Sequence, residues 1–445
     1  MNMPMNQTMD AAGGLTSTVD PSADRPGAGH RIRLPDRWLA ARVQRTIDSA
    51  AVRLELWDGS STYAGSRPPI GDLVVHDRRT LLGLAVNPDL WFGEAYMTGQ
   101  LEVRGPLEPV VEALSASAPT YPSWRERLTM ALSGDNSETD ARNNVHHHYD
   151  LGNAFYQLWL DRELLYTCAY FADRDMSLEE AQVAKMDLVC RKLRLRPGET
   201  VVEAGCGWGA LALHMARHYG VCVKAFNVSR EQLAYARARA SRENLTDRVE
   251  FIDDDYRNVT GQFDVFVSVG MLEHVGLRHY HSLAGVLRRS LRRQGGRGFL
   301  HFIGRDIPRP LNAWITRRIF PGAYPPTLAE VTTGVLAPAG MSVLDVENLR
   351  LHYAQTLAHW GERFAAAKDQ VQATYGRTFQ RAWELYLAGS QASFATGCMQ
   401  LFQIVFAPRE SSPPLGTRDW GLGTRDSAPG SRAPNPEPRI LSPEQ

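Results

Sequence analysis

A glycine-rich junction between an apolar run and a helical pattern restricts the fold of this chain more than any other feature. The apolar run 200–204 is followed by glycines at alternate positions, and the loop reads Glu203, Ala204, Gly205, Cys206, Gly207, Trp208 and Gly209. A helical pattern then covers 211–219. Because glycine has no Cβ, the backbone of such a loop can approach a ligand closely, and the helix after it offers free N–H groups. This order predicts a strand, a ligand-binding loop and a helix of a Rossmann-like sheet.

The spacing of the three glycines favours S-adenosylmethionine over a dinucleotide as the ligand. A dinucleotide-binding loop carries its third glycine one residue later and leaves room for a pyrophosphate. Glu203 precedes the loop, where a carboxylate suits a cationic amino-acid cofactor. The loop alone also fits a glycine-rich turn that binds nothing, so other residues have to decide.

Size, charge and cysteine content narrow the class of protein. The 445 residues, 43% of them hydrophobic, predict two globular domains with tails. Basic and acidic residues number 49 each, so the overall charge gives no reason to expect nucleic acid as a partner. Five cysteines without a C-x-x-C pair indicate reduced thiols in a cytoplasmic protein. Since no apolar run reaches about eighteen residues and no basic leader is present, we expect neither secretion nor a membrane span.

Composition along the chain predicts five segments. Residues 1–29 and 408–445 lack periodicity, and we expect both to be disordered. Residues 30–120 mix strand and helix patterns as in a small α+β domain, and the polar stretch 121–144 is the expected linker. In residues 145–407 strands and helices alternate, which predicts an α/β fold with a mostly parallel sheet covered on both faces.

Seven segments of the second domain are expected to be strands, namely 200–204, 222–227, 249–253, 263–269, 298–304, 342–352 and 400–407. The second helix is expected to start at Ser229 with a capping box, in which the Ser229 and Gln232 side chains each accept from the other's backbone N–H. Ligands of such sheets bind beyond the carboxyl ends of the strands. We therefore expect four groups to converge there: Glu203, Asn227, residues 254–257 and residues 270–274.

The second strand ends without the carboxylate that often holds a ribose. Asn227 stands there instead, so Asn227 and Gln232 are expected to supply neutral hydrogen bonds. Asp255 and Tyr256 follow the next strand, where adenine usually rests. The alternative for these acids is a solvated loop.

Five motifs then stand in order along the chain: HYDLGN at 148–153, YTCAYF at 166–171, GCGWG at 205–209, GMLEHVG at 270–276 and LHFIG at 300–304. With these motifs the chain resembles the cyclopropane-fatty-acyl-phospholipid synthases, whose relatives include the mycolic-acid cyclopropane synthases. The resemblance covers about 145–407 and extends more loosely into the N-terminal domain.

The resemblance implies a Rossmann-like, seven-stranded class I methyltransferase domain with a small lipid-binding-like domain before it. It also implies transfer of a methyl group from S-adenosylmethionine to the cis double bond of an unsaturated phospholipid acyl chain, which forms a cyclopropane fatty acid. An alkene is a weak nucleophile, so the site has to hold it close to the donor in a dry pocket. Ring closure needs a base, and in the family this base is a bound bicarbonate.

Residues suited to these roles stand at the matching positions of the motifs. The base site is expected to consist of Cys168, Glu273, His301, a backbone group of Ile303, and Tyr353. The cofactor is expected to contact Tyr166, Thr167, Glu203, the loop from Gly205 through Cys206, Gly207 and Trp208 to Gly209, Asn227, Gln232, Asp255 and Tyr256. Taken singly, Cys168 also fits a small buried residue and His301 a strand-end histidine with its own partners. Their joint presence favours the site.

A phospholipid substrate requires contact with a membrane surface. We expect a cytoplasmic protein that associates peripherally with the inner face of the membrane, with a homodimer as an option. The arginine-rich helix near 283–293 is one candidate contact, although its leucines also suit packing on the sheet. The segment 314–321 is expected to be a lid near the acyl chain. Five residues of the N-terminal domain are expected to help hold lipid or a partner subunit: Trp57, Trp91, Phe92, Tyr96 and Met97.

The three adjacent histidines at 146–148 do not predict a metal, because neighbouring side chains point in different directions and lack further ligands at suitable spacing. Two other functions stay open. The cation formed by methyl transfer could end as a methyl- or methylene-branched chain, or another lipid could be methylated. A decayed methyltransferase domain could bind lipid without catalysis, although the complete loop and base set argue against this.

Overall fold

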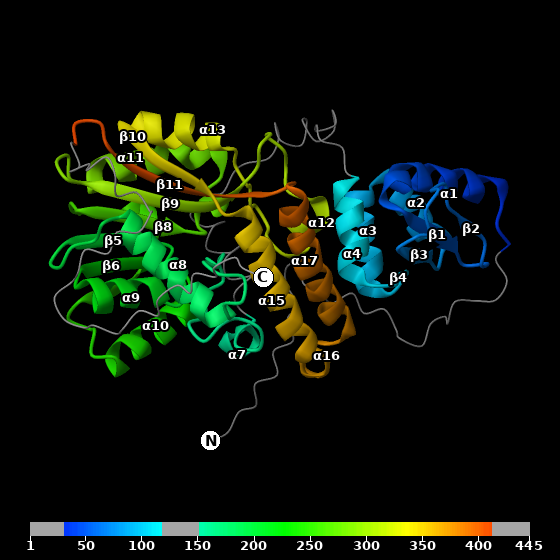
Figure 1. The fold of residues 1–445 in the computed structure, drawn as a ribbon, viewed down its shortest axis with the longest axis horizontal. Helices are drawn as coiled ribbons and strands as arrows, with labels where there is room; N and C mark the ends of the chain where they lie inside the picture. The colour runs from blue at the N-terminus through cyan, green and yellow to red at the C-terminus, as the bar shows by residue number, and fades with distance from the viewer. Residues whose placement is uncertain (1–30, 118–150, 412–445) are drawn as a thin grey trace, which may run out of the picture.

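The computed structural model describes residues 31–117 and 151–411, which form two sheets with their helices (Figure 1). The expected tail 1–29, the expected linker 121–144 and the histidines at 146–148 lie outside the described residues. Of the expected C-terminal tail, residues 408–411 are described.

The larger sheet has seven strands and confirms the predicted α/β fold class. In chain order they are β5 (Thr200–Ala204), β6 (Cys222–Asn227), β7 (Val249–Asp253), β8 (Val265–Val269), β9 (Arg297–Gly304), β10 (Met341–Asn348) and β11 (Gln400–Pro408). Their order across the sheet is β10-β11-β9-β8-β5-β6-β7. Neighbours from β5 to β9 are parallel, and β11 is antiparallel to β9 and β10. The strand expected over 342–352 is too long, since it ends at Asn348 and a helix begins at Arg350.

Helices cover both faces of this sheet (Figure 1). One apolar core lies under α8 (Leu178–Lys192), α9 (Ala210–Tyr219) and α10 (Arg230–Arg242). The other lies under α11 (Tyr280–Ser290), α13 (Leu328–Val331), the π-helical segment Thr332–Leu336 and α14 (Ala337–Ala339). Leu283, Val286 and Leu287 of α11 are buried in that core. The leucines of this helix therefore pack on the sheet and are not available for a membrane.

The start of α10 differs from the expected capping box. The Ser229 hydroxyl accepts from the Gln232 N–H at 3.4 Å, as expected. The Gln232 side chain does not return the bond, because its Oε1 accepts from Asn227 Nδ2 at 2.8 Å. The Ser229 N–H donates to Asn227 Oδ1 instead. Asn227 thus supplies the second half of the cap.

The N-terminal unit is a smaller mixed sheet with four helices. Its strands are β1 (Val52–Leu56), β2 (Ser61–Thr62), β3 (Gly71–Val75) and β4 (Leu101–Arg104), in the order β2-β1-β3-β4. Its helices are α1 (Leu34–Ile47), α2 (Arg78–Val86), α3 (Pro88–Thr98) and α4 (Leu107–Ala116), with a 3₁₀ turn at Asp48–Ala50. The side chains between them form a separate apolar core.

Helices after β9 connect the two units (Figure 1). They are α12 (Ala313–Arg318), α15 (Arg350–Ala366), α16 (Lys368–Tyr375) and α17 (Arg377–Thr396). Arg381 of α17 donates to the Tyr96 carbonyl at 2.6 Å, and Arg318 of α12 forms an ion pair with Glu94 at 2.7 Å. Tyr96, one of the aromatic residues expected to hold lipid, is buried in this junction.

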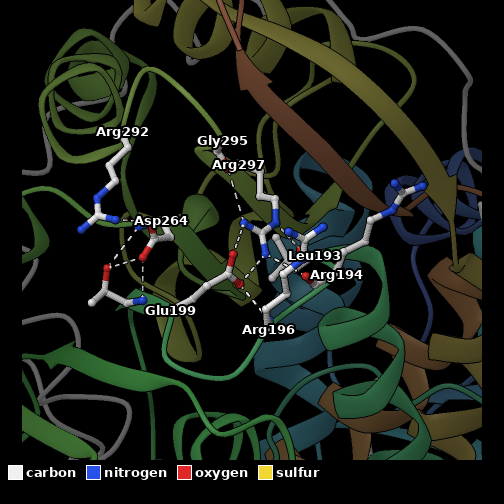
Figure 2. A network of polar contacts seen from close by, with 9 residues as sticks. Leu193, Arg194, Arg196, Glu199, Asp264, Arg292, Gly295 and Arg297 are labelled. Carbon is white, nitrogen blue, oxygen red and sulfur yellow. Dashed lines mark hydrogen bonds and ion pairs between the residues drawn. The ribbon is translucent and has the colours of Figure 1, made fainter. Parts of the chain in front are cut away.

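A polar network closes the edge of the larger sheet at which the parallel strands begin (Figure 2). The Arg297 guanidinium, at the start of β9, bonds both carboxylate oxygens of Glu199 at 3.0 and 2.7 Å and the Arg194 carbonyl at 2.9 Å. Asp264 accepts from the backbone and hydroxyl of Thr200, both at 2.8 Å, and from Arg292. These charges satisfy one another, and ligands of parallel sheets bind at the other edge.

Candidate active site

A cavity of about 1130 Å³, including its open mouth, lies beyond the carboxyl ends of β5, β6 and β8. The cofactor residues expected from the sequence line it, except Gly209: they are Tyr166, Thr167, Glu203, Gly205, Cys206, Gly207, Trp208, Asn227, Gln232, Asp255 and Tyr256. Residues from four separate stretches of sequence therefore meet at one hollow. Asp254, Arg257 and the segment 269–271 also line it.

The glycines of the loop have different structural roles. Gly207 has φ +53°, and a Cβ placed on it would meet no atom within 4 Å, so its backbone borders open space. Gly209 has φ +82°, and a Cβ there would lie 2.6 Å from the Phe251 ring. Gly209 therefore allows the start of α9 to pack on the sheet, which explains its absence from the lining.

The loop is fastened to the segment before it by Trp208. Its indole N–H donates to Asn153 Oδ1 at 2.6 Å, and the Asn153 N–H donates to Glu231 Oε1 at 2.9 Å. Asn153 begins α7 (Asn153–Tyr156) and ends the HYDLGN motif, whose first three residues lie outside the described residues. The described end of this motif thus bridges the glycine loop and α10.

Glu203 ends β5 with its carboxylate at the cavity. The side chain is 2% exposed, and its Oε2 has no hydrogen-bond partner among the described residues. Burial raises the pKa of Glu203 to about 8, and the nearby Lys185 ammonium opposes this shift. A buried acceptor without a partner is unfavourable by itself, so the position suits a ligand that brings a hydroxyl or an ammonium group.

The other polar residues of the lining are partly engaged with one another. Asn227 Nδ2 donates to the Gly207 carbonyl at 3.1 Å as well as to Gln232. Asp255 caps the 3₁₀ turn Tyr256–Asn258 by accepting from the Arg257 N–H at 2.9 Å. These bonds hold the rim of the cavity in place. The Gln232 amide nitrogen stays available at the cavity wall.

Lys185 also lines the cavity, and the sequence interpretation missed it. Its Nζ donates to Thr167 Oγ1 at 2.8 Å, and the residue is 1% exposed. A signal was present, because lysine is rare in this chain and Lys185 stands at helical spacing from the apolar positions 178, 181 and 189. A lysine on the apolar face of a helix indicates a buried charge with a specific partner.

Two of the expected base-site residues meet at the end of β9. The Ile303 N–H donates to Glu273 Oε1 at 2.5 Å, so this N–H is committed to the carboxylate. Glu273 lies in the 3₁₀ turn Leu272–His274, and its Oε2 is buried with no hydrogen-bond partner among the described residues. Burial raises the pKa of Glu273 to about 7, while the Ile303 bond opposes the shift.

His301 lies on the same face of β9 as Ile303, two residues earlier. Its Nδ1 lies 3.2 Å from Gln403 Nε2, and its Nε2 has no hydrogen-bond partner among the described residues. Burial, with Lys185 and Lys192 nearby, holds the pKa of His301 well below its ordinary value. The ring is therefore neutral near pH 7. Gln403 is the second residue that the sequence interpretation missed, because only the β9–β11 pairing places it opposite His301.

Cys168 and Tyr353 meet at the start of α15. The Cys168 thiol donates to the Ala169 carbonyl at 3.1 Å and lies 3.9 Å from the Leu349 carbonyl, which also accepts from the Tyr353 N–H at 3.1 Å. Burial raises the pKa of Cys168 far above its ordinary value, so it is a neutral thiol. The Tyr353 ring packs on Phe394, with centroids 4.5 Å apart.

Strand β11 links the expected base-site residues at the end of β9 with those at the start of α15. The Leu349 N–H donates to the Leu401 carbonyl at 2.9 Å, and Leu401 pairs with Ile303 across β11 and β9. The site residues thus lie on adjoining backbone segments that extend from the sheet edge to α15.

The segment expected to be a lid joins the two units. A Cβ on Gly93 of α3 would lie 2.3 Å from Trp314, so this glycine makes room for the indole. Phe320 lies near His274 and Tyr386, with ring centroids 6.0 and 5.6 Å away. Tyr386 in turn shares a 2.6 Å hydrogen bond with Tyr166 at the cavity. The segment therefore reaches from the N-terminal unit to the cavity wall.

Family models match both parts of the chain. The model described as mycolic acid cyclopropane synthetase matches residues 136–404, and a domain of unknown function matches residues 41–121. A probable fatty acid methyltransferase of Pseudomonas putida is 37% identical over 362 residues, which are 80% of this chain and 91% of the relative. The cyclopropane-fatty-acyl-phospholipid synthase of Escherichia coli K12 is 37% identical over 261 residues, 58% of this chain and 66% of the relative.

Solved structures agree with these matches. The cyclopropane synthase MmaA2 from Mycobacterium tuberculosis is 30% identical, with a TM-score of 0.57 over 60% of this chain and 98% of that one. The mycolic acid cyclopropane synthase CmaA1, complexed with SAH and CTAB, is also 30% identical, with a TM-score of 0.56 over 60% and 97%. The family model alone spans more than half of the chain. The chain therefore belongs to the mycolic acid cyclopropane synthetase family and is an S-adenosylmethionine-dependent methyltransferase of the cyclopropane fatty acid synthase type.

Proposed function

We propose that this enzyme converts cis double bonds of unsaturated phospholipid acyl chains into cyclopropane rings, with bicarbonate as the base. The observation that carries the proposal is two buried atoms without a hydrogen-bond partner among the described residues, Glu273 Oε2 and His301 Nε2. Neither residue lines the cofactor cavity, but Glu273 stands between the lining residues Met271 and His274, and the His301 carbonyl accepts from the N–H of Gly270, which also lines it. A simple methyl transfer to a heteroatom does not need a second buried polar site. The name of the Escherichia coli relative supports the same substrate class.

The cavity fits S-adenosylmethionine by its lining. Glu203 accepts hydrogen bonds from the cofactor, Gly207 leaves the backbone accessible, and Gln232 offers an amide. When bound, the cofactor supplies an electrophilic methyl group. The side chains around it exclude water and hold the acyl chain near that methyl, which a weakly nucleophilic alkene requires.

The base site fits a small anion that is both a donor and an acceptor. His301 donates from Nε2 if Gln403 donates to Nδ1, and Glu273 Oε2 accepts a proton or a hydrogen bond. Burial keeps the Cys168 thiol neutral, so it does not compete as a nucleophile for a carbocation. A Glu273 pKa of about 7 suits a group that takes up a proton near neutral pH.

A labelled-product assay tests this proposal. The purified enzyme is incubated with methyl-labelled S-adenosylmethionine and vesicles of a cis-monounsaturated phospholipid, and fatty-acid methyl esters are analysed by mass spectrometry and NMR. We expect the label in a cyclopropane CH₂, and we expect omission of bicarbonate to slow the reaction. A label found as a methyl branch rejects ring closure.

The second candidate is formation of a methyl- or methylene-branched fatty acid. Two relatives favour it by name: the probable fatty acid methyltransferase of Pseudomonas putida, and the tuberculostearic acid methyltransferase UfaA1 of Mycobacterium tuberculosis, which is 32% identical over 81% of this chain. The same assay decides between the two products. A protein that binds lipid without catalysis has no support from a family of enzymes.

We further propose that the enzyme works at the cytoplasmic face of the membrane and contacts anionic phospholipid through α1 and α2. No helix of the described residues is long and apolar enough to cross a bilayer. Leu34 and Trp38 of α1 are 81% and 59% exposed, and Leu82 and Val86 of α2 are also exposed. Such apolar side chains suit insertion between lipid headgroups.

Charge supports this contact. Residues 31–47 contain five arginines and one acid, Asp36, which is buried in an ion pair with Arg78 at 2.6 Å. Helix α1 therefore presents positive charge to solvent, as an anionic membrane surface requires. A homodimer remains a separate proposal, tested by sedimentation of the full chain.

A further inference from the structure

Lys185 presents a buried ammonium group at the wall of the cofactor cavity. It lies on α8, and Thr167 Oγ1 is its hydrogen-bond partner at 2.8 Å. An ammonium group has three N–H donors, so two remain for other partners. Burying a charged group with unused donors is strongly unfavourable unless an anion approaches it.

The neighbouring acids do not supply that anion directly. Asp161 accepts instead from the backbone N–H groups of Glu163 and Leu165, both at 2.9 Å. No carboxylate of the described residues forms an ion pair with Lys185 within 4.0 Å. Burial lowers the pKa of Lys185 to about 8, although Asp161, Cys168 and Glu203 oppose the shift. Burial therefore makes the charged form of Lys185 less favourable than it is in water.

Thr167 holds this ammonium at the wall of a cavity that Glu203 also lines. Thr167 and Glu203 both line the cavity, and a Cβ on Gly270 would lie 3.0 Å from Thr167 Cγ2, so Thr167 is packed against the end of β8. Lys185 and Glu203 are also near enough to shift each other's pKa. One side of the cavity therefore carries both an amine and a carboxyl group.

We propose that Lys185, together with the Thr167 hydroxyl, binds the carboxylate of the methionine part of S-adenosylmethionine, while Glu203 accepts from its α-ammonium. This inference rests on the proposed cofactor. It assigns a specificity role to Lys185, since an adenosine derivative without the amino-acid carboxylate would leave the ammonium buried without an anion. A buried polar group that is left unpaired disfavours binding of the analogue strongly.

Calorimetric titration with three ligands tests this role without measuring turnover. The ligands are S-adenosylhomocysteine, its decarboxylated analogue, and 5′-methylthioadenosine, which lacks the amino-acid end. For the unmodified enzyme we expect S-adenosylhomocysteine to bind at least about tenfold more tightly than the decarboxylated analogue. Lys185→Met should weaken S-adenosylhomocysteine by about 10- to 100-fold and leave 5′-methylthioadenosine within about twofold.

Lys192→Met is the matched control. Lys192 lies on the same helix, but its ammonium pairs with Asp345 at 3.1 Å and Glu347 at 2.6 Å, and it does not line the cavity. This variant should keep the ligand preference of the unmodified enzyme. Lys185→Arg should restore part of the preference, because it keeps a cation.

The outcomes separate the two proposals. If the unmodified enzyme binds none of the three ligands, the cofactor assignment itself fails. If it binds S-adenosylhomocysteine no better than the decarboxylated analogue, the role of Lys185 fails, and this comparison needs no variant. Equal losses for all three ligands in a folded Lys185→Met enzyme would assign Lys185 to structure alone.

Discussion

Gln403 and His301 face each other in register across β11 and β9, with Gln403 Nε2 3.2 Å from His301 Nδ1 and both side chains buried. When the amide donates, Nδ1 accepts, so the ring carries its proton on Nε2. That nitrogen has no hydrogen-bond partner among the described residues. Gln403 thereby sets both the orientation and the tautomer of the imidazole at the proposed base site.

The first prediction concerns this pair. Gln403→Leu keeps the side-chain size but removes the hydrogen bond, so we expect the ring to rotate and kcat to fall by about 10- to 100-fold. The dissociation constant for S-adenosylhomocysteine should not change, since Gln403 does not line the cofactor cavity. The pH profile distinguishes positioning from a structural role: Gln403→Glu should pair with the ring and shift the profile. An unchanged kcat for Gln403→Leu would remove Gln403 from the mechanism.

The second prediction concerns Glu273. If its carboxylate accepts the proton, the rate should rise as pH increases through about 7, because the pKa is raised to about 7 and the ionised form is the active one. Glu273→Gln should lower kcat by at least about 100-fold and remove this dependence. Calorimetry should show cofactor binding within about twofold of the unmodified enzyme. Retention of both rate and pH dependence would exclude the role.

The third prediction concerns how the buried Glu203 carboxyl makes the free energy of unfolding depend on pH. The folded-state pKa is about 8 against an ordinary value of 4.5, so the folded protein binds an extra proton between these pH values. Glu203 therefore does not lower the free energy of unfolding below about pH 4.5, where it is protonated in both states. As pH rises from about 4.5 to about 8, the carboxyl ionises more readily in the unfolded state, and the free energy of unfolding falls. Gln is neutral throughout, although Lys185 and Cys206 also face this position.

We therefore expect the ligand-free Glu203→Gln enzyme to gain about 1 kcal/mol over the unmodified enzyme at pH 8, or about 1–2 °C in Tm, and nothing at pH 4.5. Its affinity for S-adenosylhomocysteine should fall by about tenfold or more. Glu250→Gln is the control, because Glu250 is an exposed partner of Lys224. A gain that does not depend on pH contradicts the argument.

The fourth prediction concerns the network in Figure 2. Arg297→Met leaves Glu199 and the Arg194 carbonyl without their main partner, so we expect a loss of about 2–4 kcal/mol in the free energy of unfolding. Arg293 is 79% exposed and lies 3.6 Å from Glu410, so Arg293→Met should cost less than about 0.5 kcal/mol. Chemical denaturation measures both. Equal effects would show that the network contributes no more than a surface pair.

Local sequence patterns were sufficient for much of the fold and for most of the cavity lining. Apolar runs ending in polar residues located the strands, and the alternate glycines located the ligand loop. The strand expected over 342–352 was too long because Leu349, Leu351 and Tyr353 continue an alternating pattern, with neither glycine nor proline before α15. Its end depends on the Leu349 contacts with β11, which are tertiary.

The errors and omissions at the site have the same origin. The capping box failed because Asn227 competes for the Gln232 side chain, and a sequence pattern does not include that competitor. Gln403 is 102 residues from His301, so only sheet register brings the two together. To identify Lys185 as a site residue, one needs to know which face of α8 contacts Thr167. Side chains that act through distant partners are therefore the ones that local patterns miss.

The last prediction concerns the proposed membrane contact. Trp38→Ser and Leu34→Ser remove exposed apolar side chains from α1 without emptying the core, so the melting temperature should be unchanged. Each should weaken binding to vesicles containing anionic phospholipid by about tenfold, because burying such a side chain contributes about 1.5–3 kcal/mol. Val343→Ser, on the edge strand β10, is the matched control. Vesicle sedimentation at low and high salt measures the binding.

Salt separates the two contributions to this contact. Binding of the unmodified enzyme should fall steeply as salt rises, since exposed arginines of α1 attract the anionic surface. The loss caused by Trp38→Ser should persist at high salt, because insertion of an indole is not screened. Equal weakening by Val343→Ser would show that the effect is not specific to α1. Equal binding of zwitterionic and anionic vesicles by the unmodified enzyme would contradict the proposed role of the arginines. The apolar contact is tested separately, by the loss of vesicle binding in Leu34→Ser.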